Sequence, residues 1–66
     1  MKLAYFYAKL HGPATLRLAT DETLMCKRDF WQKHRMGAEW DAEIDTIWVE
    51  PAEGGKVACI VTLKAA

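Results

Sequence analysis

The amino-acid sequence predicts an α+β fold, in which one helix lies on one face of a mostly antiparallel sheet and the elements follow in the order β-β-α-β-β. Three observations predict this fold. The chain has 66 residues, which is enough for one small hydrophobic core and a single domain over residues 1–66. Alternating apolar and polar residues, separated by glycine and proline, predict four strands. One stretch between them has the apolar spacing of a helix.

The first two segments predict a β-hairpin. Residues 2–10 are rich in tyrosine and phenylalanine, alternate in polarity, and end at a His-Gly-Pro sequence. Proline removes a backbone donor and glycine permits a turn, so the first strand should stop there. Residues 14–19 place Leu16 and Leu18 on one side and therefore predict a second strand that pairs back.

The next segment predicts the helix. Thr20 can accept hydrogen bonds from the first free amides, while Asp21 and Glu22 suit the positive end of the helix dipole. The helix is expected to run to about Met36 and to end at Gly37.

The remaining segments predict the second pair of strands. Residues 38–45 form a linker in which a strand develops, because neither face of that stretch is cleanly apolar. Alternation resumes over residues 46–50, Pro51 and the glycine pair 54–55 form the return turn, and residues 56–64 are strong strand formers. The expected core residues are Phe6, Leu18, Leu24, Phe30, Trp31, Val49, Cys59 and Val61.

Composition narrows the class of protein. Hydrophobic residues make up 52% of the chain and charged residues 27%, which is typical of a folded globular domain. No apolar run approaches the roughly 20 residues that span a bilayer, and the first residues do not form a signal peptide. We therefore expect a cytoplasmic protein without a membrane partner.

The zero net charge hides a division along the chain. Residues 1–35 contain seven basic and three acidic side chains, whereas residues 36–66 contain two basic and six acidic ones. A partner of either sign could therefore meet the matching half, and a fully basic coat for nucleic acid is excluded.

The residue types needed for common chemistry are absent or far apart. The chain contains no serine, which excludes serine nucleophile mechanisms. The residues that suit zinc, His11, Cys26, His34 and Cys59, are separated by 15, 8 and 25 positions, without the close ligand pair of structural zinc sites. We therefore expect no metal, no cofactor and no enzymatic activity, and we expect both cysteines to be small buried apolar residues.

One helix can cover only one face of the sheet, so the other face needs an occupant. In the predicted registers Leu3, Tyr5, Tyr7, Trp48 and Ile60 gather on that face and form an aromatic patch. Such a patch is typical of a binding hot spot. Two alternatives remain open: two copies pack face to face as a homodimer, or Trp40 and the linker fold across the patch. The predicted partner-binding residues are Tyr5, Tyr7 and Trp48, surrounded by Glu43, Asp45 and Glu50.

A second hypothesis is nucleic-acid binding through the predicted helix. Residues 27–35 interleave cations with aromatic residues, as in proteins that bind single strands. The aromatic residues fall on the core side of the helix, however, and only two or three cations share a face, so this function is the less favoured one. The candidate contacts are Lys27, Arg28, Lys33 and Arg35.

The overall pattern resembles small proteins that bacteriophages and prophages encode against host machinery, namely anti-CRISPR proteins and phage inhibitors of host RNA polymerase. The resemblance covers the architecture: length, a hairpin, one helix, further strands and an acidic stretch from Glu39 to Glu53 that has six carboxylates and no basic residue. It implies a non-catalytic inhibitor that binds a host protein complex in the host cytoplasm. In an extended acidic segment Asp41, Glu43 and Asp45 would line up like phosphates, although such charges also protect an edge strand from pairing.

Overall fold

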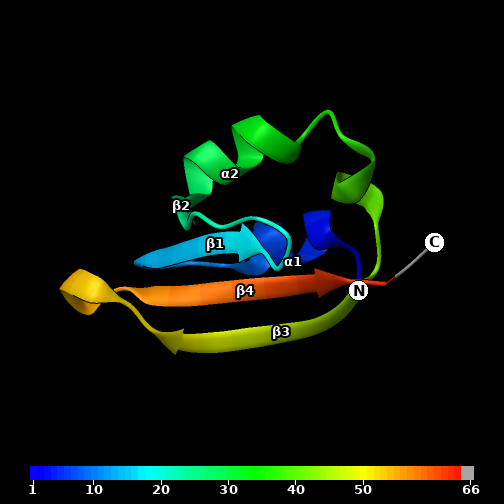
Figure 1. Cartoon of the computed structure of the whole chain (residues 1–66). Helices are drawn as coiled ribbons and strands as arrows, with labels where there is room; N and C mark the ends of the chain where they lie inside the picture. The colour runs from blue at the N-terminus through cyan, green and yellow to red at the C-terminus, as the bar shows by residue number, and fades with distance from the viewer. Residues whose placement is uncertain (65–66) are drawn as a thin grey trace.

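The computed structural model describes residues 1–64, and Figure 1 shows their course. Two helices, two short 3-10 helices and four strands make up the described chain. In chain order these elements are α1 (Leu3–Lys9), β1 (Ala14–Leu18), β2 (Met25–Cys26), α2 (Lys27–His34), η1 (Ala38–Asp41), β3 (Ile44–Pro51), η2 (Glu53–Gly55) and β4 (Val57–Leu63).

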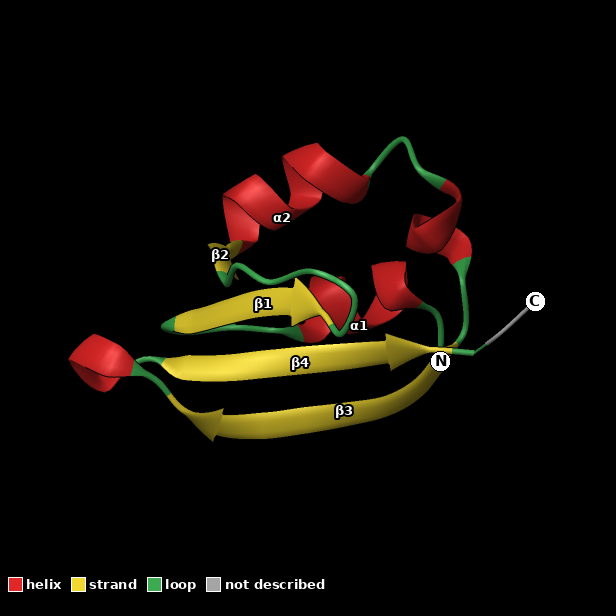
Figure 2. Ribbon diagram, in the orientation of Figure 1, coloured by secondary structure: helices red, strands yellow, loops and turns green. Residues whose placement is uncertain are grey.

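The α+β class is confirmed. The predicted order β-β-α-β-β roughly fits, although the first predicted strand is the helix α1 and β2 lies within the segment predicted as the helix. The strands form one sheet in the order β2-β1-β4-β3. The β1–β4 pair is parallel, whereas the β1–β2 and β3–β4 pairs are antiparallel. In Figure 2 both helices lie on the same side of the β3–β4 hairpin as β1. No other described element lies beyond β3, which is the outermost strand of the sheet.

The prediction of a strand over residues 2–10 is wrong, because this segment is the helix α1. The apolar side chains of Leu3, Phe6, Tyr7 and Leu10 have the i, i+3, i+4, i+7 spacing that places them on one face of a helix. Leu3 is fully buried and the other three pack against the core. Helical spacing therefore outweighed the strand preference of the aromatic residues.

The predicted helix start at Thr20 is also wrong. The chain turns after β1, where the Asp21 amide donates to the Leu18 carbonyl, and then pairs with β1 as the short strand β2. The helix α2 begins only at Lys27, with Asp29 in its first turn. Strand pairing thus competes with the local capping signal and extends the chain before α2 begins.

Both helices cover the same face of the sheet. Leu16 and Leu18 of β1 lie beside Cys59 and Val61 of β4, and all four are buried with Phe30 of α2. Leu18, Phe30, Cys59 and Val61 are core residues as predicted, and Phe6 packs against them half-buried. The other three predicted core residues, Leu24, Trp31 and Val49, are exposed. Trp31 lies on the outer side of α2, and Val49 lies on an edge strand beyond the reach of either helix.

The β3–β4 hairpin extends past the helices at one end of the molecule (Figure 1). Its turn contains Gly54 and Gly55, both with positive φ values of 70° and 73°, a conformation that favours glycine. At the other end of β3, a bulge between Ile44 and Thr46 shifts the register. This bulge explains why the sequence around residue 45 shows no clean alternation. In the described chain, no helix is long and apolar enough to cross a membrane.

Candidate protein-binding surface

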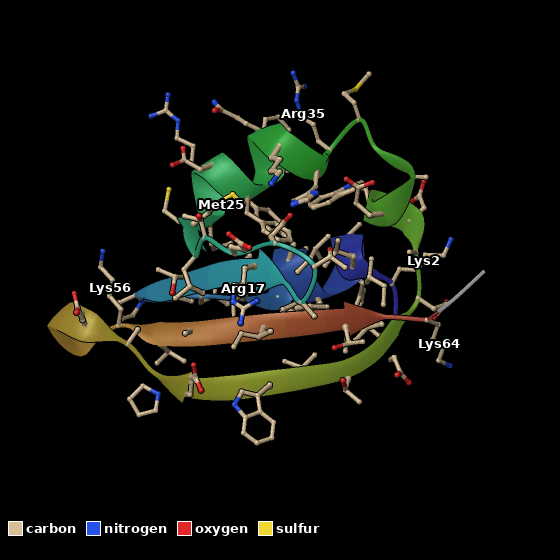
Figure 3. The ribbon with its side chains drawn as sticks, viewed as in Figure 1. Lys2, Arg17, Met25, Arg35, Lys56 and Lys64 are labelled. Carbon is tan, nitrogen blue, oxygen red and sulfur yellow. The ribbon has the colours of Figure 1, made fainter. Side chains whose placement is uncertain are left out.

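The sheet face opposite the helices has no helix over it; we call it the open face. The strand registers align Arg17, Ile60 and Trp48 in one row across β1, β4 and β3. Figure 3 shows the Arg17 side chain projecting from β1 across β4. A second row consists of Thr15, Ala58 and Glu50, and a third pairs Thr62 with Thr46.

Trp48 is the large apolar residue of the open face. Its side chain is 66% exposed, although it lies beside Ile60. The indole Nε1–H donates a hydrogen bond to Oε2 of Glu50, two residues further along the same face, at 3.2 Å. This bond restrains the indole ring, so that Trp48 would lose less side-chain entropy than a free ring on binding a partner.

A shallow groove of about 690 Å³ lies next to Trp48, at the hairpin end of the open face. Leu24 and Ala58 contribute apolar surface to it, while Glu50 and Lys56 contribute charge. Glu50 therefore lines the groove and also holds the Trp48 indole. The Glu50 side chain thus links the Trp48 ring to the groove, although Trp48 itself does not line the groove.

The two predicted tyrosine anchors do not lie beside Trp48, because they belong to α1. Tyr7 packs on the helix side of the sheet, with its ring 6.3 Å from Phe30 and 5.2 Å from Trp40. Tyr5 is exposed on α1, under the Lys9 ammonium at 5.4 Å from the ring centroid. Leu3, another expected patch member, is buried in the core. Trp48 and Ile60 do lie side by side, as the alternation of their strands predicts.

The position of Trp40 removes one alternative. Trp40 lies in η1, and its ring meets Tyr7 edge to face on the helix side of the sheet. Neither Trp40 nor the linker crosses the open face, so intramolecular cover by this segment is wrong. On the open face, the β3 residues Thr46, Trp48 and Glu50 are exposed, whereas Ala58 of β4 is buried and Ile60 is half-buried.

The three predicted acidic residues differ in their surroundings. Glu43 accepts a hydrogen bond from the N-terminal ammonium at 2.8 Å, and this contact lowers the pKa of the Glu43 carboxyl. Asp45 lies at the β3 bulge and Glu50 on the open face, and neither forms an ion pair with another described residue. Asp41 is in η1, so the expected regular row of Asp41, Glu43 and Asp45 is not formed.

Three of the four cations predicted to contact nucleic acid make contacts within the protein. The Lys27 ammonium donates to the Leu10 carbonyl and lies 4.5 Å from the Tyr7 ring centroid. Lys33 pairs with Asp21 at 3.2 Å, and the Arg35 guanidinium stacks 4.6 Å from the Trp31 ring centroid. Figure 3 shows Arg35 pointing away from the sheet. The fourth, Arg28, is exposed on α2.

A buried histidine that the sequence pattern does not indicate lies between two carboxylates. His34 in the last turn of α2 is 3% exposed, and its Nδ1–H donates to Oε1 of Glu39 at 2.8 Å. On the other side of the ring, Nε2 is 3.4 Å from Oδ2 of Asp21 without hydrogen-bond geometry. Asp21 was expected at the start of the helix, but it lies against its last turn. Nothing local in the sequence joins these residues, because Asp21 approaches through the turn after β1.

We expect the Glu39 carboxylate to make stability fall in acid. The hydrogen bond from His34 lowers the pKa of Glu39 below its ordinary value of 4.5. A lowered folded pKa contributes stability that is present above pH 4.5 and is lost as pH falls through the folded value. Urea midpoints measured from neutral pH into acid should therefore fall less steeply for Glu39→Gln than for the wild type. Glu53→Gln, an exposed change outside the ion pairs, should keep the wild-type slope. An unchanged slope in Glu39→Gln would show that this carboxylate is not linked to folding.

Within residues 1–64, no group of three or more His, Cys, Asp or Glu side chains is placed to hold a metal ion. Of the four residues that suit zinc, His34 and Cys59 are buried, whereas His11 and Cys26 are exposed. Both cysteines were expected to be buried, but Cys26, which pairs with Thr15 on the edge strand β2, is exposed.

The fold and surface together define a small α+β domain with one uncovered sheet face and an exposed tryptophan on its edge strand. No family model, no curated protein and no solved structure matches this chain.

Proposed function

We propose that this protein is a non-catalytic inhibitor that binds another protein through the open face around Trp48. The observation that carries the proposal is a tryptophan, 66% exposed, held by Glu50 on a sheet face that no helix covers. Exposed and restrained tryptophan beside a groove is typical of binding hot spots. A host protein complex is the class of partner that the resemblance to phage inhibitors implies.

The contacts of the basic helix support a protein partner over nucleic acid. Binding a phosphate backbone depends on several free cations on one face. Lys27, Lys33 and Arg35 already contact groups of this chain, which leaves Arg28 as the cation of the set without such a contact among residues 1–64. Nucleic-acid binding through α2 is therefore the alternative outcome of the test below.

We expect the Trp48→Ala variant to lose its partner while keeping its fold. The matched control is Trp31→Ala, which removes an exposed tryptophan from the opposite side of the molecule. Tagged wild type, Trp48→Ala and Trp31→Ala would each be incubated with untreated and with nuclease-treated lysate. Retained proteins would be identified by mass spectrometry, and retained nucleic acid by sequencing. Truncating a hot-spot tryptophan costs about 2 kcal/mol or more, so retention should fall at least about 30-fold for Trp48→Ala.

Three results would contradict the proposal. If Trp48→Ala retains the same protein as the wild type, the open face is not the binding surface. If the retained material is nucleic acid, and Arg28→Ala or Arg35→Ala releases it, the protein binds nucleic acid. If nothing is retained and light scattering shows a dimer that Trp48→Ala dissociates, the surface is an interface between two copies.

A further inference from the structure

The free edge of β3 offers a second kind of binding element beside the open face. β3 is the last strand of the sheet, and it pairs with β4 on one side only. The N-terminal residues cover the beginning of this edge, where the Ile44 amide donates to the Met1 carbonyl and the Leu3 amide donates to the Ala42 carbonyl. Beyond the bulge, no described strand or helix pairs with this edge (Figure 1).

The backbone hydrogen bonds of the hairpin show which groups of β3 face away from the sheet. Along an antiparallel strand, the N–H and C=O of one residue point to the same side, and consecutive residues alternate. The Ala52 amide donates to the Lys56 carbonyl at 2.9 Å, so position 52 faces β4. By alternation, Trp48 and Glu50 also direct their backbone groups to β4. Ile47 and Val49 therefore direct theirs away from the sheet.

The side chains of this edge have two properties that matter for pairing. Val49 is 60% exposed on one face and Trp48 is exposed on the other, so apolar surface is available on both sides of the strand. The charged side chains of β3 are acidic, and Asp45 and Glu50 have no ion-pair partner among residues 1–64. Figure 3 shows the labelled lysines at the two ends of the β3–β4 hairpin: Lys56 at the turn, and Lys2 and Lys64 at the opposite end.

The acidic charges of β3 favour some pairing strands over others. A second copy of the chain would place one acidic edge against another, and like charges on adjacent strands are destabilising. A strand of another protein that places lysine or arginine opposite Asp45 and Glu50 would form ion pairs with these two residues. Those two positions are five residues apart, or about 17 Å along a strand.

We propose that the β3 edge binds an extended, basic segment of the partner protein as an additional strand of the sheet, through the backbone groups of Ile47 and Val49. This inference rests on the proposed function, because the bound segment belongs to the same partner whose side chains contact Trp48. Main-chain hydrogen bonds supply affinity in this mode, and the flanking lysines or arginines supply specificity.

The test uses a fluorescent peptide, Thr-Lys-Val-Thr-Val-Thr-Lys-Val, whose lysines are spaced like Asp45 and Glu50. Binding is measured by anisotropy, and two matched peptides serve as controls. Replacing both lysines with glutamate should weaken binding by at least about tenfold, and raising the salt concentration should reduce that difference. Methylating every second backbone nitrogen on the pairing edge should abolish binding, because it removes the donors.

Two variants of the protein isolate the backbone contribution. Val49→Pro removes an outward N–H and leaves the bonds to β4 in place, a change that edge strands tolerate. Val49→Ala removes the side chain and keeps that N–H. We expect Val49→Pro to weaken peptide binding by at least about tenfold and Val49→Ala to weaken it by less than about threefold. In hydrogen exchange, the amides of Ile47 and Val49 should be slowed by bound peptide.

The outcomes separate this inference from the proposed function. If the lysine peptide does not bind, or Val49→Pro binds it as well as the wild type, the edge is not a pairing site. The Trp48→Ala retention experiment still tests the proposed function in that case. If the peptide binds and protects Ile47 and Val49 while Trp48→Ala retains every lysate protein, edge pairing is supported and the open-face proposal fails.

Discussion

Phe30→Ala is expected to remove most or all of the free energy of unfolding of this protein. Phe30 has no exposed surface, and its ring packs against both Tyr7 of α1 and His34 of α2. Removing a buried phenylalanine ring costs about 3–5 kcal/mol. A 66-residue domain has a total stability of roughly 3–10 kcal/mol, so the loss takes much or all of it. Circular dichroism melts would show a transition far below that of the wild type, or none.

The neighbouring Trp31→Ala is the matched control, because the Trp31 side chain is 39% exposed on the outer face of α2. We expect its melting temperature to change by only a few degrees. An equal drop in melting temperature for Phe30→Ala and Trp31→Ala would show that α2 is rotated about its axis relative to the orientation described above.

His34→Ala is expected to cost about 2–4 kcal/mol, since it empties a buried site and removes the neighbour of the half-buried Glu39 carboxylate and of a buried Asp21 oxygen. Glu39 would lose its hydrogen bond, and the buried Oδ2 of Asp21 would lose the imidazole beside it while the other Asp21 oxygen keeps its pair with Lys33. His34→Gln, which keeps an N–H donor near Glu39, should recover part of the loss. Urea unfolding at neutral pH measures both changes. A His34→Ala variant as stable as the wild type would mean that water solvates both carboxylates and that the histidine contributes little.

Local patterns predicted the strands of the hairpin correctly. Alternation in β3 and β4 placed Trp48 and Ile60 on the same face, and the register confirms that they lie side by side. The glycine pair marked the turn between the strands. The alternation of apolar and polar residues in a strand depends only on neighbouring positions. A short segment therefore shows it clearly when turn residues mark both of its ends.

The N-terminal helix was misassigned because two local signals conflict there. Tyr5, Phe6 and Tyr7 favour a strand by residue type, whereas the spacing from Leu3 to Leu10 favours a helix. The spacing was the better guide, since it matches the residues that are buried. Placing Tyr7 on a strand then moved it to the wrong side of the sheet and created a larger aromatic patch than the fold contains.

The His34 cluster and the free edge of β3 depend on chain topology. Asp21 reaches His34 only because the chain turns after β1 and pairs as β2 before α2 begins. β3 is an edge only because β4 inserts between it and β1. Neither arrangement follows from spacing along the sequence, since both bring together segments that have no local relation.

The central place of β4 also determines when the sheet can assemble during synthesis. β4 is the last strand in chain order, yet it joins β1 to β3, and its parallel pairing with β1 spans more than forty positions, from Leu16 to Cys59. A nascent chain that ends before β4 can pair β1 with β2, but it cannot join β3 to them. Contacts of such high sequence separation form slowly. Until then, both β1 and β3 offer unpaired edges to the ribosome surface, to chaperones and to other nascent chains.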